Sequence, residues 1–133
     1  MKIVFINCSR FPFVDWIIQG TKQYETRSRN TLGVLSGQRV YIAETGKGKT
    51  VIRCSAVICS AEKVEYLGVW ALLRKWHCVP EDSIYDWSFT RPGKWLYLLK
   101  DIHPVPVPFH PAEGKRHGRV WMEYAGQEEI SDQ

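Results

Sequence analysis

The feature that most limits the fold is a proline-rich segment at residues 103–111. Pro104, Pro106 and Pro108 alternate with hydrophobic residues, and each proline lacks a backbone N–H and fixes its own φ angle. Such a run cannot form a helix, and it cannot lie inside a sheet with hydrogen bonds on both sides. We therefore expect an extended segment at the edge of a sheet.

The rest of the chain shows two hydrophobic periods, one of about two residues, typical of strands, and one of about 3.6, typical of helices. The longer period predicts helices over 11–19 and 66–77, the first with Ser9 as its N-cap and Gly20 at its C-terminal end. The shorter period predicts strands over residues 2–7, 23–28, 38–44, 50–60, 94–101 and 119–124.

Short strands and two helices, in an order that is not a regular βαβ series, indicate an α+β fold. A small sheet hides its edges by closing on itself, so we expect a barrel-like sheet of about six strands. The 133 residues suffice for one domain with its own core. We place that domain at residues 1–126, followed by an acidic tail at 127–133.

The chain has a formal net charge of +4, which is a mild bias towards anionic partners. Its basic residues gather in clusters, which favours a local nucleic-acid footprint, although solvated loops with a basic excess explain the same pattern. The four cysteines form no CxxC pair, no apolar run reaches the ~18 residues of a membrane span, and the N-terminal apolar run is too short for a signal peptide. We expect reduced thiols, a cytoplasmic protein and no membrane partner.

The turn at residues 46–50 partly matches a phosphate-binding loop. A Walker loop needs a further glycine where this chain has Ala43, and it joins a strand to a helix, whereas this turn joins two strands. We therefore expect no nucleoside-triphosphate loop. The basic tip could contact a phosphate backbone, or it could be a plain solvated turn.

Three histidines, His103, His110 and His117, recur at intervals of seven residues, but prolines between them exclude the helix that would align them. No histidine follows the cysteines at zinc-finger spacing, and no pair of carboxylates suits Mg²⁺ or Ca²⁺. We expect no metal and no cofactor. Any hydrolysis would then depend on Lys, Tyr, Glu, Thr or His side chains.

The richest functional segment is residues 20–27. In a strand, Glu25 and Arg27 share one face, and Lys22 at the preceding bend can reach them. Arg27 can bind a phosphate with two nitrogens or hold Glu25, and a partly desolvated Lys22 beside a carboxylate can act as a base or nucleophile. The same residues also fit a structural ion-pair network on a sheet face.

The order Gly-x-Lys-x-x-Glu-x-Arg in residues 20–27 resembles the signature of the ASCH domain family, which belongs to the PUA-like superfamily. The predicted strand 38–44 with its Thr-Gly turn and the aromatic strand 95–99 resemble later strands of that family. The resemblance implies a PUA-like pseudo-β-barrel with two or three flanking helices and a cleft lined by the motif. It also implies a link to RNA.

Some relatives are similar to amidohydrolases of N4-acetylcytidine, and others to metal-independent ribonucleases. In the amidohydrolase-like pattern a threonine stands three residues after the lysine, whereas this chain has Glu25 there and Thr26 on the other face. The resemblance therefore carries over Lys22 alone. It leaves a ribonuclease and a modified-nucleoside amidohydrolase as the enzymatic alternatives.

Aromatic residues make up 13% of the chain, and most of their rings are expected in the core. Tyr85 and Trp87 fall in a predicted loop, and loops lie on the surface. Rings beside a basic groove hold single-stranded nucleic acid by stacking on its bases. The basic run at 115–119 either flanks such a cleft or forms a solvated turn.

We expect first that the chain binds RNA or another single-stranded nucleic acid, or a nucleoside-like small molecule. Its binding residues would be Lys22, Arg27, Thr45, Lys47, Tyr85, Trp87, Arg116 and Arg119. The alternative is a hydrolase in which Lys22 is the base or nucleophile, Glu25 tunes it, and His117 or Tyr85 donates a proton to the leaving group. A module for a small ligand or protein would use the same cleft with little dependence on salt.

Overall fold

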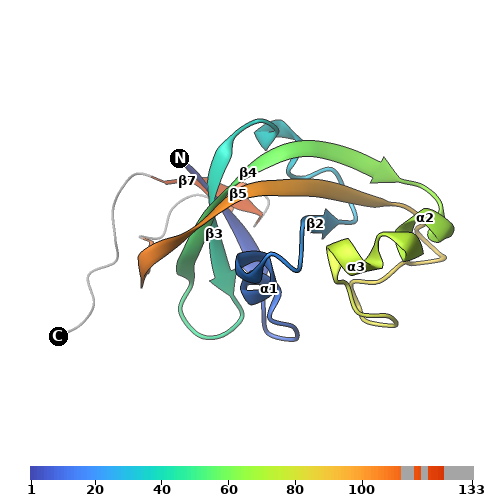
Figure 1. Ribbon diagram of the computed structural model, residues 1–133, viewed down its shortest axis with the longest axis horizontal. Coiled ribbons are helices and arrows are strands. Elements are labelled where there is room, and N and C mark those ends of the chain that lie inside the picture. Colours follow the sequence, from blue (N-terminus) through green and yellow to red (C-terminus); the bar gives the residue numbers. More distant parts are fainter. Residues whose placement is uncertain (112–115, 118–119, 125–133) are drawn as a thin grey trace.

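Residues 1–111, 116–117 and 120–124, the part of the chain that the computed structural model describes, form a mixed β-sheet with helices packed against it (Figure 1). The strands are β1 (Lys2–Asn7), β2 (Tyr24–Arg27), β3 (Arg39–Thr45), β4 (Val51–Val64), β5 (Lys94–Phe109), β6 (Arg116–His117) and β7 (Trp121–Glu123). The helices are α1 (Phe13–Gln19), the short 3₁₀ helix η1 (Gly33–Leu35), α2 (Leu67–Leu72) and α3 (Arg74–His77).

The sheet runs in the order β2-β5-β4-β3-β1-β7-β6. β1 and β3 are parallel, and the other neighbours are antiparallel. The two longest strands, β4 and β5, arch over the molecule (Figure 1), and their pairing has three register shifts, which bend a sheet. The bend brings β2 close to β1. The Arg27 side chain of β2 reaches across and donates a hydrogen bond to the Phe5 carbonyl of β1.

The α+β class and the barrel-like sheet expected from the sequence are confirmed, with seven strands and three α-helices in the described part of the chain. Two expectations about the helices were wrong. The helix expected over 66–77 is divided at Leu73 into α2 and α3. Ser9 does not cap α1, which begins after Pro12, because the Ser9 N–H and hydroxyl both bind the Asn7 side chain instead.

The proline-rich segment is the second half of β5. It pairs with β4 on one side, with Pro104 opposite Cys54 and Phe109 opposite Ile52. On the other side, β2 pairs only with residues 95–98 of β5. Within the described part of the chain, the prolines therefore lie at a sheet edge, where the missing N–H groups cost no ladder hydrogen bonds.

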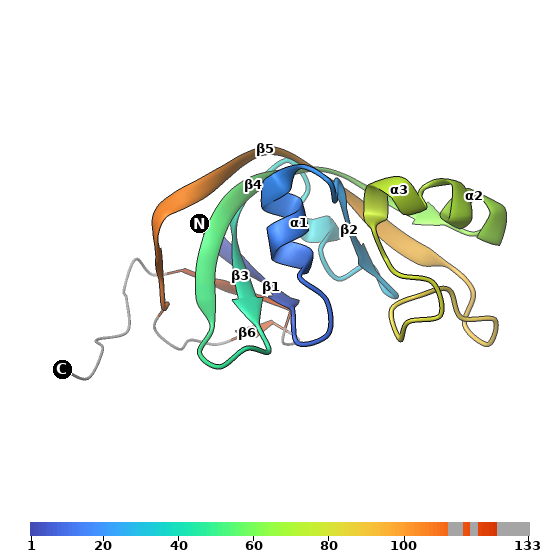
Figure 2. The ribbon, with the colours of Figure 1, turned by 60° about the horizontal axis from the view of Figure 1, so that its bottom comes forward.

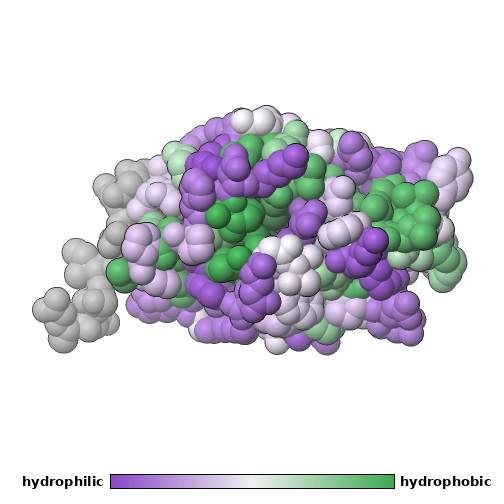
Figure 3. Space-filling view, in the orientation of Figure 1, coloured by the Kyte–Doolittle hydropathy of each residue, from purple (hydrophilic) through white to green (hydrophobic). Residues whose placement is uncertain are grey.

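The core lies between the sheet and the helices that pack against it, with α1 covering one part of the sheet and α2 another. Alternate residues of β4, from Ile52 to Ile58, are at most 1% exposed, and α1 buries Val14 and Ile17 against the same cluster. A second cluster holds α2 in place through Trp70. The outer side of α2 is not covered, and Figure 3 shows its apolar side chains as a surface patch at one end of the molecule; this α2 patch comprises Tyr66, Leu67, Val69 and Leu72.

The four cysteines all lie in the described part of the chain, and each is free. No described helix combines the length and the apolar character that crossing a membrane requires. The expected acidic tail, residues 127–133, lies outside the described residues.

The turn between β3 and β4 allows a test of local packing. Gly46 and Gly48 both have left-handed φ angles, +87° and +95°; a Cβ at Gly46 would lie 2.8 Å from Asn7 Oδ1 and 2.9 Å from Ser9 N, whereas Gly48 has nothing within 4 Å. We predict that Gly48→Ala lowers the free energy of unfolding by about 1 kcal/mol through backbone strain. Gly46→Ala should lower it by about 3 kcal/mol, because overpacking adds to the strain.

Urea unfolding of both variants, with the wild type, measures this difference. Equal losses at the two positions would contradict the close approach of the turn to Asn7 and Ser9.

Candidate functional site

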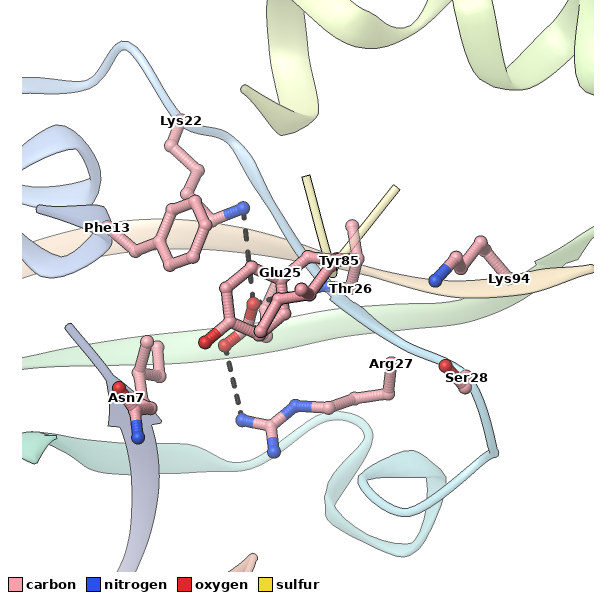
Figure 4. A pocket seen from close by; sticks show the side chains of 11 residues that line it. Asn7, Phe13, Lys22, Glu25, Thr26, Arg27, Ser28, Tyr85 and Lys94 are labelled. Carbon is pink, nitrogen blue, oxygen red and sulfur yellow. Dashed lines mark hydrogen bonds and ion pairs between the residues drawn. The ribbon is translucent and has the colours of Figure 1, made fainter. Parts of the chain in front are cut away.

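A cavity of roughly 230 Å³ opens in the gap between residues 5–7 of β1 and residues 22–28 around β2, which we call the seam (Figure 4). The lining combines basic, polar and aromatic side chains. It consists of Ile6, Asn7, Phe13, Lys22, Glu25, Thr26, Arg27, Ser28, Ile84, Tyr85 and Lys94. Three of these are formally cationic and one is a carboxylate, so the cavity favours an anionic occupant.

The end of α1 directs the lysine of the motif into the seam. Gly20 has a left-handed φ of 85°, and its N–H donates to the Ile17 carbonyl at 3.0 Å, which ends the helix. The Lys22 N–H then donates to the Trp16 carbonyl, so the chain turns back under α1. The Lys22 side chain therefore extends beside Phe13 into the cavity (Figure 4).

The Lys22 ammonium group is almost fully buried, with 2% of the residue exposed. Its Nζ donates to the His77 carbonyl at 2.5 Å, lies 4.0 Å from Glu25 Oε1, and lies 4.8 Å from the centre of the Phe13 ring. Burial lowers the pKa of Lys22 below its ordinary value, and the Glu25 carboxylate acts in the opposite direction. Lys22 is therefore a lysine held by a short polar network at the wall of a cavity.

Glu25 and Arg27 join the two sides of the seam. Glu25 Oε1 accepts a hydrogen bond from the Thr26 N–H at 2.9 Å, and Oε2 accepts one from Arg27 Nη2 at 3.2 Å. The same Nη2 donates to the Phe5 carbonyl at 2.8 Å. Arg27 thus links β2 to β1 where the sheet has no ladder hydrogen bonds between them.

His77 is a structural residue that places an acceptor opposite Lys22. It is fully buried and stacks on Trp70, with ring centres 3.8 Å apart. The Val79 N–H donates to Nδ1, so Nδ1 carries no proton, and Nε2 donates to the Trp70 carbonyl. Burial lowers the pKa of His77 to about 4, which keeps the ring neutral near pH 7.

Asp86 holds the loop that forms the front wall of the cavity. Burial alone would raise its pKa, but hydrogen bonds to its carboxylate outweigh this and lower the pKa to about 2. The donors include Trp70 Nε1 at 2.8 Å, Arg74 Nη2 at 3.2 Å and the Asp82 N–H at 2.9 Å. The neighbouring Tyr85 lines the cavity, and its ring overlaps Glu25 in the view of Figure 4.

Lys94, at the start of β5, is a site residue that no sequence motif indicated. It is 6% exposed, lines the cavity, and forms no hydrogen bond or ion pair with a described residue. Its Nζ lies 5.8 Å from the centre of the Trp70 ring. Burial lowers its pKa, partly offset by Asp86. One feature of the sequence could have indicated Lys94: a lysine follows Gly93 at the start of a strand whose next residues are hydrophobic.

The structure brings together four of the expected site residues, Lys22, Glu25, Arg27 and Tyr85, which line one cavity. It also adds residues of β1, α1, β2 and the loops that were not among the expected site residues. Those additions, besides Lys94, are Ile6, Asn7, Phe13, Thr26, Ser28 and Ile84.

Three expected binding residues do not line the cavity. Thr45 pairs with Asn7 in the ladder, which places it one strand away from the seam. Lys47 is directed to Glu44, with its Nζ 4.0 Å from a carboxylate oxygen. Trp87 packs towards Trp70, because the Asp86 anchor turns it into the cluster under α2.

The remaining expected residues are not placed. The side chains of Arg116 and His117, and the whole of Arg119, lie outside the described residues. Among the residues that the structure describes, no group of three or more His, Cys, Asp or Glu side chains is arranged to hold a metal ion.

Neither a protein-family model nor a curated protein matches this chain. Solved structures of an ASCH protein from Zymomonas mobilis do share its fold. A serine-to-alanine variant of that protein is 17% identical, with a TM-score of 0.73 over 94% of this chain and 88% of that one. The ASCH protein without a stated variant is 19% identical, with a TM-score of 0.63 over 77% and 68%.

A tyrosine-to-phenylalanine variant of the same Zymomonas mobilis protein is 20% identical, with a TM-score of 0.66 over 82% of this chain and 74% of that one. At these identities the likeness shows the fold. The chain therefore has the α+β fold of ASCH domain structures, as the sequence analysis expected.

The buried His77 predicts that the protein loses stability in mild acid. Its pKa is about 4 in the folded chain against an ordinary value of 6.5, so the unfolded chain takes up the proton first as the pH falls. Above pH 6.5 the ring is neutral in both the folded and the unfolded chain, and His77 then makes its full contribution to the free energy of unfolding. We predict that the free energy of unfolding falls by about 1.4 kcal/mol per pH unit between those two values.

Urea unfolding at intervals from pH 7.5 to pH 4.5 measures this slope. His77→Gln should remove most of it, whereas His103→Gln, at an exposed position, should retain it. A wild type whose stability is constant over this range would contradict the neutral, buried state of His77.

Proposed function

We propose that this chain is an ASCH domain that binds single-stranded RNA, with one nucleotide held in the seam cavity. The observation that carries the proposal is the excess of positive charge in an aromatic-walled cavity. Phosphate groups supply the matching negative charge, and rings such as Tyr85 offer a surface on which a base can stack.

The size of the cavity supports a small occupant. Its volume of roughly 230 Å³ is below the ~300–1,000 Å³ of pockets that enclose drug-sized ligands. A single base or nucleotide turned out of a strand is an occupant of this scale. A folded RNA helix would not enter, so we propose recognition of single-stranded or end nucleotides.

The polar lining supports contact with the edge of a base. Asn7 lines the cavity, and because its Oδ1 accepts hydrogen bonds from Ser9, its side-chain NH₂ is the group that it offers as a donor to an occupant. Thr26 and Ser28 line the same cavity and add hydroxyl groups, which can donate or accept. Together these groups could pair with the carbonyl and amino groups of a base.

A second candidate function, a metal-independent hydrolase acting on RNA or a modified nucleoside, is favoured by Lys22. Its Nζ is buried at the cavity wall and its pKa is lowered by burial. A lysine that gives up its proton easily can remove a proton from an attacking hydroxyl or water, and Glu25 would stabilise the ammonium ion formed. Tyr85, which lines the same cavity, could protonate the leaving group.

One experiment separates binding from catalysis. Wild type and Lys22→Met, which keeps the length of the side chain, are incubated with a mixed single-stranded RNA in EDTA, after circular dichroism confirms that the variant folds. We predict intact RNA and a mobility shift that weakens steeply with added salt, because phosphate contacts release counterions. We expect Lys22→Met to weaken binding about tenfold, the cost of losing one charged contact.

Cleavage in EDTA that disappears in Lys22→Met would replace the binding proposal with the hydrolase. If the folded wild type neither shifts nor cleaves the RNA, that result contradicts both the binding proposal and the hydrolase.

Tyr85 allows a second discrimination. Tyr85→Phe keeps the ring and removes the hydroxyl, whereas Tyr85→Ala removes both. If the ring stacks on a base, we predict that Tyr85→Phe binds RNA like the wild type and that Tyr85→Ala binds about tenfold or more weakly. Fluorescence anisotropy with a labelled single-stranded RNA measures both constants. Equal binding by all three proteins would contradict stacking on Tyr85.

A further inference from the structure

The seam contains a buried cation, Lys94, for which the described residues provide no counterion. Lys94 is 94% buried, yet it forms no hydrogen bond or ion pair with a described residue. In Figure 4 its Nζ extends into the cavity towards Tyr85 and Thr26, from the side opposite Lys22 and Phe13. A buried ammonium group normally has a partner, because burying an unpaired charge costs several kcal/mol.

Contacts with the residues that the structure describes do not supply that partner. Trp70 lies 5.8 Å away, near the limit of a cation–π contact, and its ring is already stacked on His77. Asp86 is the acidic group whose charge acts on Lys94. Its carboxylate, however, is occupied by Trp70 Nε1, Arg74 and the Asp82 N–H.

The backbone fixes Lys94 at the cavity. In the antiparallel ladder Trp95 is opposite Arg27. Lys94 precedes Trp95 and Ser28 follows Arg27, so the two residues come opposite each other. Both residues line the cavity. Lys94 and Ser28 therefore lie on one side of the cavity, Lys22 lies on the opposite side, and Glu25 and the Arg27 guanidinium lie between them (Figure 4).

We propose that Lys94, assisted by Ser28, binds a phosphate group of the occupant, so that the cavity takes phosphorylated nucleotides in preference to free nucleosides. This inference rests on the proposed function and narrows it to one substrate class. Lys22 is already bound to the His77 carbonyl and lies beside Glu25, whereas Lys94 has no hydrogen-bond or ion-pair partner among the described residues and is open to an incoming anion. Tyr85 lies between these two lysines, where the base of a nucleotide would stack.

The test compares Lys94→Met with Lys100→Met, an exposed lysine on the same strand. Isothermal titration measures the affinity of each protein for the four ribonucleoside 5′-monophosphates, the four nucleosides and inorganic phosphate. We expect the wild type and Lys100→Met to prefer monophosphates to nucleosides by tenfold or more. Lys94→Met should lose that preference while its nucleoside affinity stays the same. In the wild type, the NMR signal of the Lys94 side chain should move when phosphate is added.

Nucleoside 3′-monophosphates and dinucleotides show whether the phosphate is terminal or part of the chain. Equal affinity for nucleotides and nucleosides, or nucleotide binding that Lys94→Met leaves unchanged, would overturn the inference while leaving RNA binding intact. Phosphate binding that depends on Lys94, without any binding of RNA, would support the anion site and contradict the proposed function.

Discussion

One arginine side chain holds together the two sides of a gap in the sheet, and the candidate site depends on it. Arg27 Nη2 donates both to the Phe5 carbonyl of β1 and to Glu25 of its own strand. Glu25 in turn faces Lys22, whose ammonium donates to the carbonyl of His77. In a closed barrel, backbone hydrogen bonds would join β1 to β2. Here the polar side-chain contacts join the two strands instead, and the wider spacing leaves room for the cavity.

The rest of the fold maintains this gap. The register shifts between β4 and β5 bend the sheet until β2 faces β1. α1 covers the seam from one side through Phe13, and the loop anchored by Asp86 covers it from another through Tyr85. Because the contacts that keep the seam open are mostly buried and charge-assisted, the cavity is preformed, which lowers the entropic cost of binding a ligand.

The sequence predicts the site residues that are close together in the chain, but it does not predict those that come from distant strands. Residues 22–27 lie within one turn and one strand, so their spacing already placed the lysine, the carboxylate and the guanidinium together. Lys94 enters the site through the pairing of β5 with β2, which single-residue patterns do not specify. Lys47 and Trp87 were assigned to the cleft by charge and by loop position, but an ion pair and an aromatic cluster hold them elsewhere.

Chemical-shift mapping with ¹⁵N-labelled protein and a short single-stranded RNA tests most directly whether the seam is the binding site. If it is, the shifted amides should concentrate in residues 5–7 and 22–28, with further shifts at Tyr85 and Lys94. Shifts confined to the α2 patch or to the turn at 46–50, with the seam unchanged, would contradict it.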